Sequence, residues 1–332
     1  MNILIIAPFE GWVKTYLTQL GNGLCRIGNH VEYINYRLLD KSLFSFLKND
    51  DAISLLRNRN LEKLLKKSKP DAVLFVIARM NFDFEMIRTY YKGKILVYDV
   101  DGPAWGCYSE LSWLKHVDCL FTASRVSQRM LQKNSFQAFY LAGFVDPEHY
   151  KMMTLDNDSK EKYGAPVSFV GRPTPRRNEF LSEITECGLK LWGRKWHDET
   201  KCPVEKLQKC SLYDKDIFED EVVKVYNASD LYVNILREPL NESSTILSLQ
   251  AYAVPSCGTC IVQEWVEELD EAFEDGKEII SFKTKAEFAE SVKKYSKDKD
   301  TARKIGEAGR NRVLKCHTHE HRAHELINFL TS

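Results

Sequence analysis

The stretch SFVGRPTPRRNEFL, residues 168–181, changes character within a few positions. It begins as an apolar run of β-forming side chains, turns at Gly171 and two prolines, and continues as a helical pattern with three arginines. A strand that ends in glycine and leads into a helix leaves free backbone N–H groups at the positive end of the helix dipole. Because glycine also lets a ligand approach the backbone closely, the stretch predicts an anion site within an α/β fold.

The arginines of this turn favour a particular anion. Arg172 and Arg177 flank the turn, and a guanidinium group suits phosphate oxygens better than a lysine ammonium does. A diphosphate is therefore the expected ligand. The alternative is that the arginines are surface residues of a loop, one of them paired with Glu179.

On either side of this stretch, short apolar runs alternate with amphipathic segments along the whole chain. The apolar runs predict buried strands, and the intervals show helical periodicity. This alternation is typical of an α/β protein with doubly wound parallel sheets. The expected strands are 2–7, 30–35, 71–77, 94–100, 117–123, 166–171, 189–193, 230–236, 258–263 and 278–282, and the expected helices include 12–27, 51–67, 81–91, 125–133, 285–298, 300–315 and 320–330.

The length favours more than one domain. A chain of 332 residues with 44% hydrophobic content is too long for one ordinary core. We expect a Rossmann-like domain at 1–150, a polar linker at 151–165, a second Rossmann-like domain at 166–315 and a C-terminal helix at 316–332.

Charge and cysteine content limit the partners and the compartment. Lys plus Arg equals Asp plus Glu at 47 each, so no global field attracts the chain to nucleic acid or to an anionic membrane. Nine cysteines without regular spacing, and no signal peptide, predict reduced thiols in a cytoplasmic protein. The N-terminal run MNILIIAPF is too short to span a bilayer and is expected to form a core strand.

A second informative stretch is REPLNESSTILSLQAYAVPSCGTC, residues 237–260. Glu242 and Gln250 are separated by seven residues in an apolar helical pattern, which would place them on nearly the same face of one helix. Such a pair could grip the hydroxyl groups of a bound ligand. The alternative is an ordinary carboxylate at a helix start and an ordinary polar glutamine.

These motifs occur in an order that resembles a known family. VSFVGR with a basic residue five positions after its arginine, VYNASDLYVNIL at 225–236 and the Glu242–Gln250 segment resemble the nucleotide-sugar half of group 1 GT-B glycosyltransferases. Within that clan the chain is most similar to the CgeB-like spore-maturation proteins. Further similar segments are AGFVDPEHY (142–150), LKLWGRKW (189–196) and CHTHEHRAHELI (316–327), so the resemblance covers about 138–330.

The resemblance implies a fold and an activity. The GT-B fold has two Rossmann-like domains that face a cleft, with a C-terminal helix that crosses back. The implied activity is transfer of a hexose from a nucleotide diphosphate sugar, above all a UDP-sugar such as UDP-glucose, to an unidentified acceptor. The reaction is expected to be retaining and to need neither a metal nor another cofactor.

The resemblance also assigns roles to residues. Gly171, Arg172 and Arg177 would hold the donor diphosphate, Glu242 would contact the donor sugar, and Gln250 would bind the nucleotide ribose. Gln250 departs from the family pattern, because an amide cannot supply the charge-assisted hydrogen bonds of a carboxylate. This departure leaves open a non-catalytic relative that binds nucleotide sugars or glycans. A separate alternative is a GT-B sugar-nucleotide epimerase.

The first half offers candidates for the acceptor side. In VYDVDGPAW, residues 97–105, Asp99 and Asp101 follow a predicted strand and would meet ligands at the carboxyl edge of the sheet. They could orient an acceptor hydroxyl, cap the strand end, or hold Mg²⁺ or Mn²⁺ as the Asp-x-Asp motif of GT-A enzymes does. Gly11 could admit the acceptor closely or form a plain turn. Arg172, Glu242, Asp99 and Asp101 are the catalytic candidates.

Two other clusters are expected to be structural. The histidines at 317, 319 and 321 point in different directions on a helix, and the lone Cys257–Cys260 spacing lacks a partner pair. No metal site is therefore assigned. The acceptor stays open between a glycan, a peptide, a small metabolite and a modified DNA base.

Overall fold

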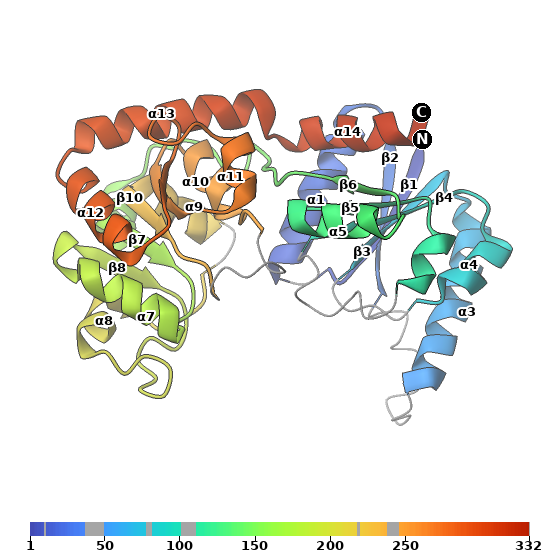
Figure 1. The fold of residues 1–332 in the computed structure, drawn as a ribbon, viewed down its shortest axis with the longest axis horizontal. Coiled ribbons are helices and arrows are strands. Elements are labelled where there is room, and N and C mark those ends of the chain that lie inside the picture. Colours follow the sequence, from blue (N-terminus) through green and yellow to red (C-terminus); the bar gives the residue numbers. More distant parts are fainter. Residues whose placement is uncertain are drawn as a thin grey trace. The chain divides into compact units, whose positions relative to one another are not determined.

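The computed structural model describes residues 1–9, 11–36, 50–77, 82–100, 111–217, 220–237 and 246–331. The chain divides into two compact units. The first comprises Met1–Ala142, Glu242–Ile246 and His319–Ser332, and the second comprises Gly143–Asn241 and Leu247–Thr318. Each unit is built on one parallel sheet with helices on its faces (Figure 1).

The sheet of the first unit has the strand order β2-β1-β3-β4-β5-β6. All neighbouring strands are parallel, and the inner strands are buried on both faces. Its strands are β1 (Asn2–Ala7), β2 (His30–Asn35), β3 (Ala72–Ile77), β4 (Lys94–Asp99), β5 (Cys119–Thr122) and β6 (Ala138–Tyr140). Its helices include α1 (Gly11–Arg26), α3 (Asp50–Ser68), α4 (Phe84–Tyr90), α5 (Arg125–Lys133) and α14 (His319–Thr331).

The sheet of the second unit has the order β12-β11-β10-β7-β8-β9, again with parallel neighbours. Its strands are β7 (Ala165–Val170), β8 (Leu189–Trp192), β9 (Ser211–Tyr213), β10 (Ser229–Asn234), β11 (Cys260–Glu264) and β12 (Ile280–Phe282). Its helices include α6 (Asn157–Tyr163), α7 (Pro175–Leu181), α8 (Glu205–Cys210), α9 (Asp220–Ala228), α10 (Gln250–Ser256), α11 (Glu267–Ala272), α12 (Lys285–Tyr295) and α13 (Lys299–Cys316). The chain winds outward from β7 through β9 and then, on the other side of β7, from β10 to β12. This is the Rossmann order.

The predicted α/β architecture with two doubly wound, Rossmann-like sheets is confirmed. Each of the ten predicted strands coincides with an observed one. The prediction missed β6 and β9, which have three residues each and lie at sheet edges, where a short apolar pattern carries little signal. The predicted linker 151–165 contains helix α6, whose N-cap Asp156 accepts a hydrogen bond from the Ser159 N–H.

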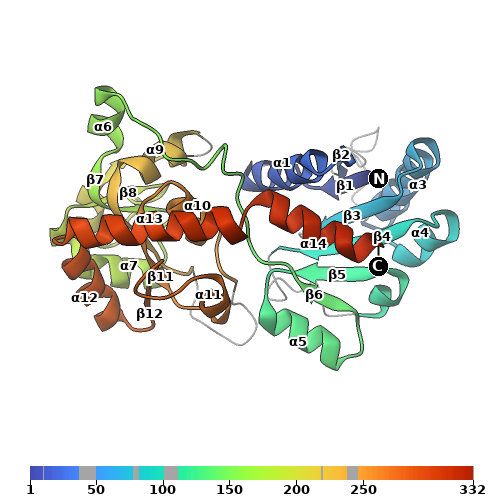
Figure 2. The ribbon, with the colours of Figure 1, turned by 90° about the horizontal axis from the view of Figure 1, so that it is seen from above.

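Helix α14 lies at the far end of the chain and packs on α1 in the first unit (Figure 2). The two helices come so close at Gly23 that a Cβ atom there would lie 2.5 Å from the His319 carbonyl oxygen. Arg26 of α1 pairs with Glu320 at 3.0 Å, and the Arg322 Nε donates to the Ala142 carbonyl at 2.9 Å. Within the described residues, no helix is both long and apolar enough to cross a membrane.

Candidate functional site

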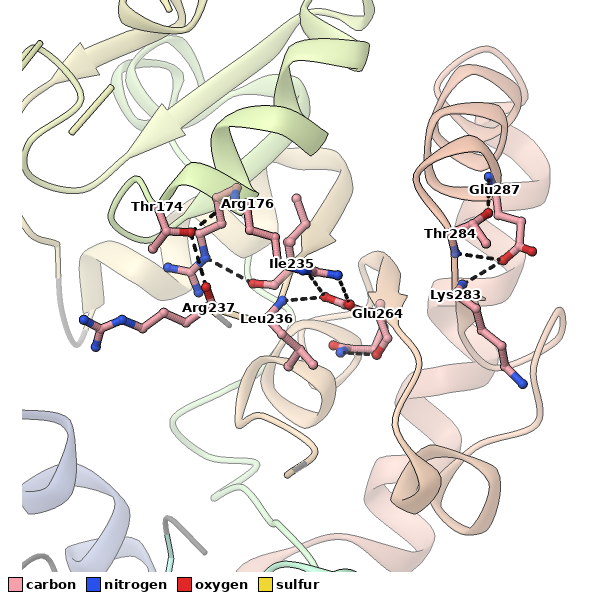
Figure 3. Close-up of polar contacts among 11 residues, drawn as sticks. Thr174, Arg176, Ile235, Leu236, Arg237, Glu264, Lys283, Thr284 and Glu287 are labelled. Atoms are coloured by element: carbon pink, nitrogen blue, oxygen red, sulfur yellow. Dashed lines mark hydrogen bonds and ion pairs between the residues drawn. The ribbon is translucent and has the colours of Figure 1, made fainter. Parts of the chain in front are cut away.

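The order of the second sheet brings the carboxyl ends of β7 and β10 together, so that Arg177, which follows β7, contacts Ile235, 58 positions further along the chain. At this point the winding of the sheet reverses, and open parallel sheets bind ligands in the crevice outside such a reversal. The segment after β7 is joined to the segment after β10, because the Thr174 hydroxyl donates to the Arg237 carbonyl at 3.3 Å (Figure 3). The turn at Gly171 therefore lies at the reversal point.

Helix α7 begins as its sequence predicts. Thr174 is the N-cap and accepts a hydrogen bond from the Arg177 N–H at 3.2 Å, and Pro175 stands at the first helical position. However, α7 has only seven residues, so its dipole is weaker than that of a longer helix. The arginine side chains supply most of the positive charge here.

Gly171 is enclosed by neighbouring backbone and rings. Its N–H donates to the Trp192 carbonyl at 2.8 Å, and its carbonyl accepts from the Trp196 Nε1 at 2.9 Å. A Cβ atom at Gly171 would lie 2.9 Å from the Phe169 ring. Packing alone therefore requires glycine at this position, whether or not a ligand approaches it.

Arg172 extends from the same turn with 52% of its side chain exposed, and its Nη2 donates to the Asp216 Oδ2 at 2.8 Å. The same carboxylate forms an ion pair with Arg194, whose Nε lies 2.6 Å from the Asp216 Oδ2 and whose side chain is also 52% exposed. Partial burial acts to raise the pKa of Asp216, but the hydrogen bond and charge of Arg172, together with Arg194, hold that pKa below its usual value. Asp216 is consequently ionised at neutral pH.

We call Arg172, Arg194 and Asp216 the arginine cluster. The sequence pattern predicts Arg172 at this site but not Arg194 or Asp216. Arg194 lies in LKLWGRKW, a segment that the sequence links only to the family resemblance. Its position just after the end of strand β8, at the carboxyl edge of the sheet, is the feature that identifies Arg194 as a candidate.

Arg177 joins the ends of β7 and β10. Its Nε donates to the Ile235 carbonyl at 3.2 Å and its Nη1 to the Arg172 carbonyl at 3.0 Å. The guanidinium also lies over the Phe169 ring, 5.2 Å from its centroid. These contacts fix one positive charge at the reversal point.

Arg176, for which the sequence predicts no role, forms a buried ion pair with Glu264 at the end of β11 (Figure 3). Only 1% of the Glu264 side chain is exposed. The Arg176 Nη1 donates to the Glu264 Oε2 at 2.7 Å, and the same oxygen accepts from the Leu236 N–H at 2.8 Å. Glu264 therefore joins α7, β10 and β11 at the carboxyl edge of the sheet.

The Glu242–Gln250 segment differs from the prediction in one respect. Helix α10 begins at Gln250, so Gln250 stands at its first position and not two turns inside a longer helix. Just before it, the Ser248 hydroxyl accepts a hydrogen bond from the Asn234 Nδ2 at 2.6 Å, and side-chain bonds of this kind compete with helix formation. Glu242 lies outside the described residues.

Candidates in the first unit lie at the carboxyl edge of its sheet. Asp99 is the last residue of β4 and is 1% exposed, and Gly11 is the first residue of α1, which follows β1. Strands β1 and β4 both flank β3, so their carboxyl ends are close to one another. Asp101 is outside the described residues.

The histidine and cysteine clusters have structural surroundings. The His317 Nε2 lies 3.0 Å from the Ala272 carbonyl oxygen in a buried contact. Cys257 and Cys260 are buried free thiols, and burial raises the pKa of each to about 12. Across the described residues, no group of three or more His, Cys, Asp or Glu side chains could hold a metal ion.

The chain has the GT-B fold, which is defined by two Rossmann-like units. Its candidate site lies in the second unit, where the strand order reverses. A family model described as glycosyl transferase-like matches residues 176–328, which include most of the second unit. A search of the curated proteins finds no match in sequence.

Solved structures extend the similarity over the whole chain. Sucrose-phosphate synthase from Thermosynechococcus elongatus superposes with a TM-score of 0.72 at 14% identity, covering 99% of this chain and 98% of that one. A glycosyltransferase from Rickettsia africae gives 0.71 at 14% identity, covering 99% and 97%. Anabaena HepE in complex with UDP gives 0.69 at 12% identity and covers 100% of both chains. At these identities the likeness establishes the shared fold.

Proposed function

We propose that this protein is a group 1 GT-B glycosyltransferase that moves a sugar from a nucleotide diphosphate sugar to an acceptor. The observation that carries the proposal is the arrangement of Arg172 and Arg177 around Gly171, where the strand order reverses. The glycosyl transferase-like family match covers most of the same unit, beginning at residue 176, after Gly171 and Arg172. The structures of HepE with UDP and with UDP-glucose support a UDP-sugar, in particular UDP-glucose, as the donor.

The proposed chemistry follows from these charges. Glycosyl transfer releases a nucleoside diphosphate, and preorganised cations that stabilise its developing charge lower the barrier. Arg172 presents an exposed guanidinium, and Arg177 is held by two backbone carbonyls, so little reorganisation accompanies the reaction. We propose that the reaction is metal-independent and retains the anomeric configuration.

The remaining assignments rest on the family resemblance. Glu242 is proposed to contact the donor sugar and Gln250 the ribose, with Asp99, Asp101 and Gly11 on the acceptor side. The segments 142–150, 189–196 and 316–327 support the more specific proposal of a CgeB-like hexosyltransferase, and the nine irregularly spaced cysteines support a cytoplasmic location.

Calorimetry with the purified protein tests the proposal. UDP, GDP, dTDP, ADP, CMP and their common sugars are titrated with and without Mg²⁺, and sugar transfer or donor hydrolysis is measured in parallel. We expect UDP to bind without metal and its sugar to be turned over. Binding without turnover would instead indicate a non-catalytic relative, and metal-dependent binding would favour a role for Asp99 and Asp101 as metal ligands.

The substitution Arg172→Ala tests the site itself. Loss of the phosphate contacts should lower kcat/KM on the order of a hundredfold or more. Arg303→Ala is the matched control, because Arg303 is an exposed arginine of α13 in the same unit. Wild-type kinetics in Arg172→Ala, with the fold intact, would remove Arg172 from the mechanism.

A further inference from the structure

We propose that the arginine cluster contributes to the site for both phosphates of the nucleoside diphosphate, with Arg194 as a further phosphate ligand beside Arg172 and Arg177, and Asp216 as the residue that positions Arg172 and Arg194. The inference rests on the proposed function and adds two residues to it. It is carried by the shared carboxylate contacts and by the backbone around Arg194.

The shared contacts leave both arginines available to a ligand. Asp216 accepts a hydrogen bond from the Arg172 Nη2 at 2.8 Å and forms an ion pair with the Arg194 Nε at 2.6 Å, with 17% of its own side chain exposed. These contacts use a minority of the N–H donors that a guanidinium carries, and each arginine side chain is half exposed. Two cations and one anion leave a net positive charge that faces solvent at the ends of β7 and β8.

The backbone around Arg194 holds it beside Arg172. Gly193 has a φ of 134°, and a Cβ atom there would lie 2.2 Å from the Gly171 carbonyl oxygen. Lys195, on the other side, has a φ of 74°, in the left-handed region that L-amino acids other than glycine rarely adopt. Trp196 then donates its Nε1 to the Gly171 carbonyl. Such conformations persist where the surroundings enforce them, and they cluster at ligand sites.

Asp216 could either neutralise the charge of the arginines or hold their side chains in position, and an experiment can distinguish these two roles. If the carboxylate only neutralises the arginines, its removal increases the local positive charge and should strengthen the binding of UDP. If it positions them, its removal lets two long side chains adopt many rotamers, and UDP binding should weaken. The two roles therefore predict opposite changes in affinity.

Titration calorimetry on the full chain measures these changes with UDP and UMP as probes. We expect Asp216→Asn to weaken UDP binding about tenfold despite the gain in positive charge, and Arg194→Gln to do the same. UMP, with one phosphate, should lose less affinity than UDP in Arg194→Gln. Arg194→Lys, which retains the charge without the planar fork, should show an intermediate loss, and Arg303→Gln should bind like the wild type.

The outcomes separate this inference from the proposed function. Equal or tighter UDP binding in Asp216→Asn overturns the positioning role, and wild-type UDP binding in Arg194→Gln overturns its role as a phosphate ligand. If Arg172→Ala loses UDP in the same series, the proposed function survives both results. A wild-type protein that binds no nucleoside diphosphate overturns the proposed function and the inference together.

Discussion

Gly193 makes the strictest demand on residue type near the site. Its φ of 134° disfavours side chains, and an added Cβ would meet the Gly171 carbonyl oxygen at 2.2 Å. That oxygen accepts the Trp196 Nε1 bond and cannot move without breaking it. We therefore expect Gly193→Ala to lower the free energy of unfolding by about 3 kcal/mol or more, measured by urea denaturation.

Gly276 is the control, because it shows the cost of a positive φ without a steric clash of the added Cβ. Gly276 has a φ of 76° in the same unit, but nothing lies within 4 Å of an added Cβ. Gly276→Ala should cost only about 1 kcal/mol. Equal losses in the two variants would mean that the contact with Gly171 contributes nothing.

Single residues of the site were predictable only where local sequence encodes their place. Gly171, Arg172 and Arg177 follow one strand directly, so strand–turn–helix reasoning placed them together. Asp216 is 44 residues from Arg172, and the pairing depends on how β8 and β9 are ordered in the sheet. No periodicity in the sequence carries that information.

At the scale of elements, the Arg176–Glu264 pair joins α7 to the end of β11. Glu264 is 1% exposed and Arg176 18%, so removing one partner leaves a charge with little water around it. We expect Glu264→Gln to cost about 3–5 kcal/mol in the free energy of unfolding. Chemical denaturation monitored by tryptophan fluorescence measures this loss.

Two further variants test why the pair matters. Replacing both partners by apolar residues, Arg176→Met with Glu264→Leu, should recover much of the stability, because no charge then stays buried without its partner. Glu179→Gln removes a partner of the exposed Glu179–Lys285 pair, which also involves α7, and should change stability little. A double variant no more stable than Glu264→Gln would contradict this account.

Elements were predicted well where apolar periodicity decides them. The central strands are continuous apolar runs because both of their faces are covered, and their bounds agree with the sequence to within a few residues. The segment before α10 differs from the prediction. Its apolar pattern favours a helix, but α10 begins only at Gln250, and in residues 246–249 the Ser248 side chain is bonded to Asn234. A polar tertiary contact overrode a local pattern there.

At the scale of the whole molecule, the first unit is completed by the end of the chain. His319, Arg322, Ala323 and Leu326 of α14 are buried, and Gly23 of α1 brings the two helices into backbone contact. Deleting 319–332 should expose the face of α1 that α14 covers. This should lower the free energy of unfolding of the first unit by about 1.5–3 kcal/mol for each large apolar side chain that becomes exposed. The first unit is therefore expected to unfold at a lower temperature than in the full chain.

The second unit supplies the contrast that makes this deletion informative. The three members of the arginine cluster and Arg177 all belong to the unit that ends at Thr318. The shortened chain should therefore still bind UDP while its first unit melts early, which calorimetric melting with and without UDP can resolve. Gly23→Ala should act in the same direction more weakly, because its Cβ would lie 2.5 Å from the His319 carbonyl oxygen. If the shortened chain melts like the full one, α14 does not stabilise the first unit, and its contacts with α1 are incidental to folding.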